Sequence, residues 1–184
     1  MKHIVRLMVL AGLMMVVTSC GDPASGSGKS AVFLVANGGQ KWGIIADVYN
    51  AAVPGKATNN YFDITIKSER KDPTKIPLGV YSDVILEEYR IDYFRSDGNP
   101  KVPEPLVVPM NSRVPVDGET KLNLLVLTRD AKLKSPLKEL AFGGGEGSII
   151  MAAVITFYGK DLAGNSLTVT YQLHIEAGDY AADV

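Results

Sequence analysis

The chain has 184 residues, and its 19 basic and 20 acidic side chains give a formal net charge of −1. This balance excludes the basic excess with which proteins bind nucleic acids or anionic membrane surfaces electrostatically. The length suits one domain with a substantial core better than two. Cys20 is the single cysteine of the sequence, so no disulfide within the chain stabilises the fold.

The first twenty residues have the order of a bacterial secretory signal. Lys2 and Arg6 supply positive charge, residues 7–17 form an uncharged apolar run, and small residues precede Cys20. This run is shorter than the roughly 18 residues that a membrane-spanning helix needs. We therefore interpret residues 1–19 as a signal peptide, with a plain secretory signal and an incidental cysteine as the alternative.

The sequence Val17-Thr18-Ser19-Cys20 resembles the lipobox of bacterial lipoproteins. The resemblance implies cleavage after residue 19 and acylation of Cys20, which becomes the first residue of the mature protein. Two or three acyl chains anchor a protein far more firmly than one. Gly21 follows Cys20, at the position where an aspartate would signal retention in the inner membrane. If the host has two membranes, the resemblance therefore implies that the protein is sorted to the outer one. We expect a lipid-anchored protein of the bacterial cell envelope.

Residues 20–30 separate this anchor from the rest of the chain. They are small and polar and show no hydrophobic periodicity, which is typical of a flexible Gly/Ser tether. Gly28-Lys29-Ser30 does not complete a phosphate-binding loop, because Pro23 stands where that motif needs a glycine.

From residue 31 onward the apolar residues recur with the two-residue period of β-strands. Within residues 84–95 this period puts Tyr89 and Tyr93 on one side of a strand and Phe94 on the other. The pattern predicts strands over residues 31–36, 43–49, 61–67, 84–95, 121–128, 149–158 and 167–175.

Two segments interrupt the strand pattern. The proline-rich residues 101–109 predict an extended segment that cannot be a central strand but can protect the edge of a sheet. Ser135–Leu140 is the one predicted helix, with serine as its cap, proline in its first position and glycines beyond its end. We interpret the glycine-rich residues 143–147 as a link after this helix, the alternative being a mobile binding loop.

Residues 155–167 predict a hairpin whose turn is Asp161-Leu162-Ala163-Gly164-Asn165. Asp161 and Asn165 suit it because their side chains bond nearby backbone groups, and Gly164 suits it because glycine adopts positive φ. This turn resembles the D-x-A-G-N turn of the last hairpin in bacterial immunoglobulin-like and fibronectin-III-like domains. The resemblance implies a fold and no particular activity.

Frequent strands and the lack of long helices predict an all-β protein. We expect an antiparallel immunoglobulin-like Greek-key β-sandwich over residues 31–178, with one short helical crossover between opposing sheets. Residues 179–184 then form a C-terminal tail. The irregular residues 49–75 leave the strand order there open.

Few residues suit catalysis or metal binding. His174 lies on the polar side of the last strand, where a solvated histidine is the ordinary interpretation. Glu87 and Glu88 are predicted to face opposite ways, so they cannot form the carboxylate pair of a glycosidase. Asp97 with Asn99, like the hairpin turn, lacks the spacing of a calcium loop. We expect no catalytic residue, metal or cofactor.

The function predicted on these grounds is a non-catalytic envelope lipoprotein whose β-sandwich mediates protein interaction or envelope assembly. The alternative is a carbohydrate-binding module in surface polysaccharide handling. Exposure of Tyr89 and Tyr93, together with Phe94, would favour that alternative, and burial of the two tyrosines would remove its basis. The expected partners are the membrane, through the lipid, and another envelope protein or a glycan, with no nucleic acid.

Overall fold

The computed structural model describes residues 29–39, 43–50, 57–74 and 79–180. Cys20, most of the predicted tether and residues 181–184 lie outside the described residues. Among the described residues, no helix is long and apolar enough to cross a membrane. The elements in chain order are β1 (Val32–Asn37), β2 (Gly43–Asp47), β3 (Asn60–Arg70), η1 (Val80–Ser82), β4 (Val84–Arg95), β5 (Leu106–Val114), β6 (Glu119–Leu127), α2 (Arg129–Lys132), η2 (Leu137–Gly143), β7 (Ser148–Asp161) and β8 (Ser166–Gly178).

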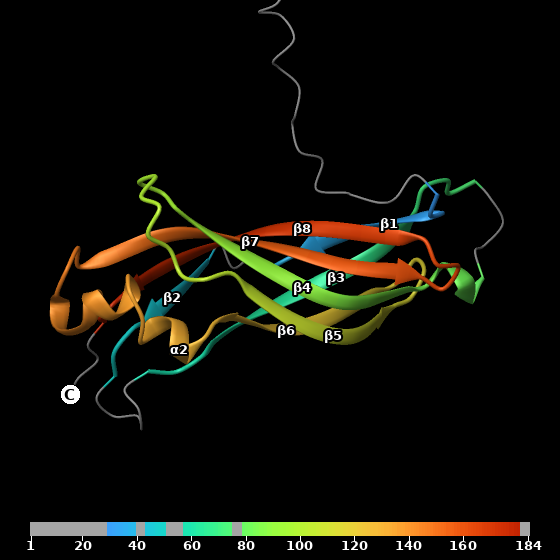
Figure 1. Ribbon diagram of the computed structural model, residues 1–184. Helices are drawn as coiled ribbons and strands as arrows, with labels where there is room; N and C mark the ends of the chain where they lie inside the picture. Colours follow the sequence, from blue (N-terminus) through green and yellow to red (C-terminus); the bar gives the residue numbers. More distant parts are fainter. Residues whose placement is uncertain (1–28, 40–42, 51–56, 75–78, 181–184) are drawn as a thin grey trace, which may run out of the picture.

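The strands form two sheets that enclose one hydrophobic core (Figure 1). The small sheet has the order β1-β3-β6, and the large sheet has the order β2-β8-β7-β4-β5. The predicted all-β class is therefore confirmed. The expectation of purely antiparallel pairing is wrong. The chain leaves the small sheet after β1, and the next strand, β2, pairs in parallel with β8 at one edge of the large sheet.

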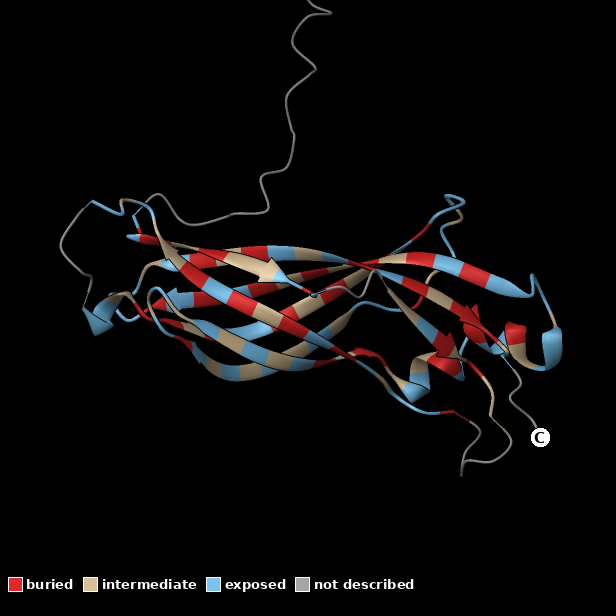
Figure 2. Cartoon of the chain, turned by 180° about the vertical axis from the view of Figure 1, so that it is seen from behind, coloured by how far each residue is buried: buried red, intermediate tan, exposed pale blue. Residues whose placement is uncertain are grey.

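The two-residue period places the core as predicted. Phe62, Ile64 and Ile66 of β3 are each at most 2% exposed, and the bands of buried and exposed residues alternate along the long strands (Figure 2). In β4 the buried and exposed positions also alternate, with one interruption. The register of β4 against both neighbours shifts between Leu86 and Glu88.

This shift is a β-bulge, in which β4 carries one residue more than β7 and one fewer than β5. Its consequence is that Glu87 and Glu88 are both exposed. The prediction that these two carboxylates face opposite ways is wrong, because strict alternation does not hold across a bulge. Glu87 instead pairs with Lys160 of β7, with 3.0 Å between Oε2 and Nζ.

The proline-rich segment leads into β5, which is the outermost strand of the large sheet. Pro109 lies within β5, where an edge strand tolerates the missing N–H donor. The prediction that this segment is not a central strand is confirmed.

A short helical connection joins β6 of the small sheet to β7 of the large sheet, as predicted for a crossover. Its helices differ from the prediction in position. The segment η2 begins at Leu137, with Pro136 as its N-cap instead of its first residue. It is preceded by α2, which was not predicted, and Thr128 Oγ1 caps α2 by accepting a hydrogen bond of 3.0 Å from Ala131 N.

The two ends of the sandwich carry different elements. The "Ser30 end" holds Ser30, η1 and the β7–β8 turn, since Ser30 bonds to Asp161 and Leu162 N donates to Asp83 O beside η1. The "Gly178 end" holds the last residue of β8 together with α2 and η2 (Figure 1). The thirteen residues of β8 place the two ends roughly 40 Å apart.

Candidate functional site

Tyr89 and Tyr93 of β4 are core residues, 3% and 5% exposed. Their hydroxyls reach across the core to β6, where they donate to Leu125 O at 3.1 Å and to Val126 O at 2.8 Å. Burial raises the pKa of both phenols. Phe94, which is 56% exposed, points to the opposite face. The structure therefore separates these three residues, and the tyrosines offer no stacking surface to a sugar.

The β7–β8 turn is held by the Asp161 carboxylate. Asp161 is 5% exposed and accepts hydrogen bonds from Asn165 N at 2.8 Å and from Asn165 Nδ2 at 2.9 Å. Burial by itself raises the pKa of this carboxyl, but the bonds from Asn165 and from Ser30 outweigh it and hold the pKa below its usual value. Gly164 has a φ of +87°, as expected. The carboxylate serves the turn and the attachment of Ser30.

His174 lies exposed on the outer face of β8, opposite Ala152 of β7. In the part of the chain that the structure describes, no group of three or more His, Cys, Asp and Glu side chains is arranged to hold a metal ion.

A row of exposed hydrophobic side chains crosses the outer face of the large sheet at the Gly178 end. Ile45, Phe94 and Ile150 are 65%, 56% and 43% exposed. Ile45 of β2 and Ile150 of β7 both lie opposite Glu176 of β8, while Phe94 of β4 lies opposite Ala152, one diagonal step from Ile150. Cross-strand neighbours on one face are roughly 5 Å apart and diagonal ones roughly 7 Å. We call Ile45, Phe94 and Ile150 the "outer-face row".

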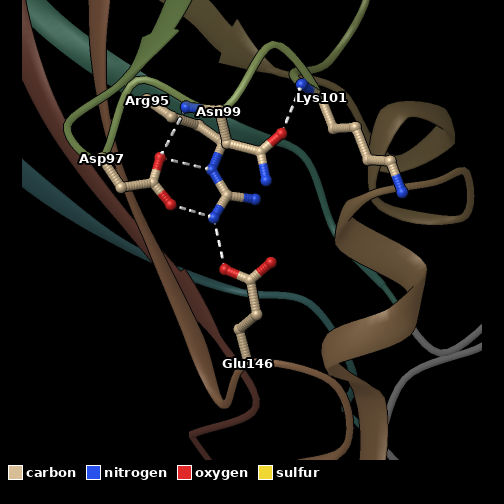
Figure 3. A network of polar contacts seen from close by, with 5 residues as sticks. All are labelled: Arg95, Asp97, Asn99, Lys101 and Glu146. Atoms are coloured by element: carbon tan, nitrogen blue, oxygen red, sulfur yellow. Dashed lines mark hydrogen bonds and ion pairs between the residues drawn. The ribbon is translucent and has the colours of Figure 1, made fainter.

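Arg95 follows Phe94 and turns to the opposite side, where its side chain is only 3% exposed. Its guanidinium donates to two carboxylates, Asp97 and Glu146 (Figure 3). The bond from Arg95 Nε to Asp97 Oδ1 measures 3.0 Å. Asp97 belongs to the loop after β4, and Glu146 belongs to the glycine-rich loop before β7. Arg95 therefore ties two loops from different parts of the chain to each other.

Hydrogen bonds within the first loop continue this network. Asp97 Oδ1 accepts from Asn99 N at 3.0 Å, and Asn99 Oδ1 accepts from Lys101 N at 3.0 Å. The bonds from Arg95 and from the Asn99 N–H lower the pKa of the Asp97 carboxyl, and the two carboxylates raise the pKa of the guanidinium. Asp97 and Asn99 thus stabilise a turn.

The glycine-rich residues 143–147 link η2 to β7, as interpreted from the sequence, and Glu146 also anchors them. Gly145 has a φ of +59°, and a Cβ atom there would come within 2.9 Å of Glu139 O. Glycine is therefore required at this position. The loop keeps a fixed course beside Arg95 instead of acting as a plain spacer.

Two small hollows flank the network. One, of about 290 Å³, is lined by Phe94, Arg95 and Asn99 among others. The other, of about 170 Å³, lies between the proline-rich segment and α2. Small-molecule sites usually measure roughly 300–1,000 Å³. Both hollows lie at or below the lower limit of this range, whereas a third hollow at this end, of about 570 Å³ and lined by Lys134 and Lys138 among others, lies within it.

Phe142 adds a second exposed aromatic ring at the Gly178 end. It is 78% exposed, and its ring centroid lies 4.3 Å from that of Tyr49. Its φ of 60° lies in the left-handed region that residues other than glycine seldom adopt, and its N–H donates to the Asp179 carboxylate. An exposed aromatic in this backbone conformation fits a surface selected for contact.

The sequence signals for this end are partial. Arg95 is an even number of residues from Tyr89 and Tyr93, so the alternation of side chains along a strand places it on the same, buried side of β4. The outer-face row is not visible in the sequence, because Ile45 and Ile150 come to flank Glu176 on one face only through the pairing of β2 with β8. No protein-family model matches this sequence, and no curated protein matches it.

Proposed function

We propose that this protein is a non-catalytic, lipid-anchored protein of the bacterial cell envelope that binds another envelope protein through its Gly178 end. The outer-face row carries this proposal. Ile45, Phe94 and Ile150 expose apolar side chains on paired strands, where folding alone favours polar residues. A protein that keeps such a row in water gains by covering it.

The sequence around Cys20 supports the anchor, since a charged start, a short apolar run and small residues precede that cysteine. Acylated Cys20 would hold the chain on a membrane, and Gly21 favours the outer membrane in a host with two membranes. Metabolic labelling with a palmitate analogue tests this part, because a Cys20→Ala variant should lose the label.

We also propose that the sandwich is immunoglobulin-like, with a Greek-key order. Immunoglobulin domains place strands A, B and E in one sheet and strands C, F and G in the other, with C′ beside C in some classes. The small sheet β1-β3-β6 fits A, B and E, and β8-β7-β4-β5 fits G, F, C and C′. Domains of this kind commonly bind partners through a sheet face or the loops at one end.

A protein partner fits the surface better than a glycan does. Sugar rings stack on exposed aromatic faces, whereas Tyr89 and Tyr93 are buried and the row offers one aromatic, Phe94, with two isoleucines. Protein interfaces combine an apolar centre with a polar rim. Glu176 of β8 lies between Ile45 and Ile150, and His174 of β8 lies opposite Ala152, so polar groups accompany the row.

Photo-crosslinking in living cells tests the proposal. A benzophenone amino acid replaces Phe94 in one variant and Tyr158 in another, the second being an aromatic residue on the outer face of the same sheet, 36% exposed. Tyr158 lies opposite Glu88, six residues before Phe94 along β4, which is roughly 20 Å away.

The variant at position 94 should form one discrete protein adduct, and the variant at position 158 should not. An Ile150→Asp change should abolish the adduct at position 94 without altering the protein's abundance. Equal adducts at both positions, or no adduct at position 94, would contradict the proposal.

A further inference from the structure

A second exposed apolar cluster lies at the Ser30 end. Val80 and Tyr81 of η1 are 59% and 73% exposed, and Leu162 of the β7–β8 turn is 47% exposed. The two segments touch, since Leu162 N donates to Asp83 O at 3.0 Å and Asp83 N donates to Val80 O at 3.0 Å. We call Val80, Tyr81 and Leu162 the "end patch".

The chain enters the domain beside this patch. Ser30 is 3% exposed and its hydroxyl bonds to the Asp161 carboxylate, one residue before Leu162. Nine residues lie between Cys20 and Ser30, so this stretch spans at most roughly 35 Å in any conformation. A lipid on Cys20 therefore holds Ser30, and the end patch beside it, within roughly 35 Å of the membrane surface.

The charges around the patch are compatible with a membrane. Asp83 and Asp161, the carboxylates closest to it along the chain, are buried and accept hydrogen bonds from backbone N–H groups. Asp83 also pairs with Arg113. The exposed side chains of the patch would contact a membrane through apolar groups. Such a contact does not need an excess of basic residues, and this chain has no such excess.

We propose that the end patch rests in the headgroup region of the membrane that holds the lipid, with Tyr81 as its central contact. This inference rests on the lipid anchor in the proposed function. Tyrosine suits the boundary between headgroups and acyl chains, because its ring is apolar and its hydroxyl remains hydrated. Three side chains form a weak contact alone, but the tether holds them at high local concentration. The sandwich would then stand on the membrane with its Gly178 end outward.

Quenching by brominated lipids tests the contact. The lipidated full-length protein is reconstituted into vesicles of phosphatidylethanolamine and phosphatidylglycerol, with and without phospholipid brominated high on the acyl chain. A Tyr81→Trp variant reports on the end patch, and a Phe94→Trp variant is the matched control at the other end. Native Trp42 contributes the same background to both variants.

Tryptophan at position 81 should be quenched at least about twofold more than tryptophan at position 94, because interfacial side chains reach roughly 5–10 Å into the bilayer boundary. Adding Val80→Ser and Leu162→Ser to Tyr81→Trp should reduce that quenching. Equal quenching at both positions would overturn the inference. The intact mass of the same preparation shows whether Cys20 is acylated: an acylated protein without quenching refutes the membrane contact alone, whereas an unacylated protein refutes the anchor and the contact together.

Discussion

The two ends of the sandwich use ion pairs of opposite design. At the Ser30 end the carboxylate of Asp83 is buried and its partner Arg113 is exposed, with side-chain exposures of 3% and 56%. At the Gly178 end the guanidinium of Arg95 is buried, at 3%, and its partners Asp97 and Glu146 are 53% and 54% exposed.

Which partner of the ion pair is buried determines whether the network holds the backbone directly or through other side chains. A buried carboxylate accepts hydrogen bonds from the backbone, as Asp83 does from Val116 N at 2.8 Å, and so fixes the chain directly. A buried guanidinium donates only, so Arg95 holds its loops through the side chains of Asp97 and Glu146. The Ser30 end is therefore fixed through its backbone, whereas the loops of the Gly178 end are held through the side chains of Asp97 and Glu146.

The largest effect is expected at Asp83. The Asp83→Asn change weakens the bonds to Val116 N and Arg113 and should lower the free energy of unfolding by about 2–3 kcal/mol. Urea denaturation measures this as a lower midpoint with an unchanged slope. Glu87→Gln, which breaks an exposed pair, is the control and should cost less than about 0.5 kcal/mol.

The same variant has a pH signature. Because the pKa of Asp83 is lower in the folded protein than in the unfolded chain, its stabilising effect is present above about pH 4 and is lost as the pH falls through the folded value. The stability difference between wild type and Asp83→Asn should therefore shrink below pH 4. A difference that is constant from pH 7 to pH 3 would contradict the role of the charge.

Lys132 gives a pH dependence of the same sign at the Gly178 end, but in the alkaline range, because the pKa of this group is also lower in the folded protein. Its side chain is buried, its Nζ donates to Asp47 O at 2.7 Å, and burial lowers its pKa to about 8. Between about pH 8 and 10 the unfolded chain binds more protons, so wild type should gain about 2 kcal/mol of stability relative to Lys132→Met. Denaturation midpoints of both proteins at pH 7.5 and pH 10 measure this gain. A stability difference between the two proteins that is the same at both pH values would contradict the prediction.

A smaller change is expected at Arg95. The Arg95→Leu substitution leaves Asp97 and Glu146 half-exposed and hydrated, so it should cost only about 1 kcal/mol. Hydrogen exchange should accelerate in residues 96–101 and 143–147, and the adduct formed at position 94 should decrease. Arg90→Leu, which removes an exposed pair with Asp92, should leave both loops unchanged.

The smallest effect on stability is expected in the outer-face row. Phe94→Ser removes an exposed ring and should change the free energy of unfolding by less than about 0.5 kcal/mol. For the binding test, the crosslinking amino acid is moved to position 150. Phe94→Ser in this protein should prevent recovery of the partner that crosslinks at position 94 in the protein without the substitution. Undiminished recovery would show that Phe94 does not contribute to binding.

Alternation along single strands explains which parts of the fold were predictable. It placed Tyr89 and Tyr93 on one side of β4 and Phe94 on the other, because side chains on a pleated strand alternate every two residues. It missed the exposure of both Glu87 and Glu88, since a bulge depends on the partner strands. The β5 strand was seen only as an extended segment, because its prolines hide the strand pattern.

The candidate surface was less predictable, because it depends on contacts between distant residues. Asp97 carries a local turn signal, but Glu146 reaches Arg95 across 51 residues. Ile45 and Ile150 share the outer face, on either side of Glu176, only because β2 pairs in parallel with β8. The Asp161–Asn165 turn, whose contacts are local, was predicted in detail.

The orientation of the sandwich on the membrane tests the account most directly. Single cysteines at positions 81, 158 and 94 can each carry a donor dye, since the native thiol of Cys20 is acylated in the lipidated protein, and vesicles carry an acceptor lipid. Energy transfer should be strongest from position 81, intermediate from position 158 and weakest from position 94. Equal transfer from all three positions, or the reverse order, would contradict an upright domain that contacts the membrane at its Ser30 end and a partner at its Gly178 end.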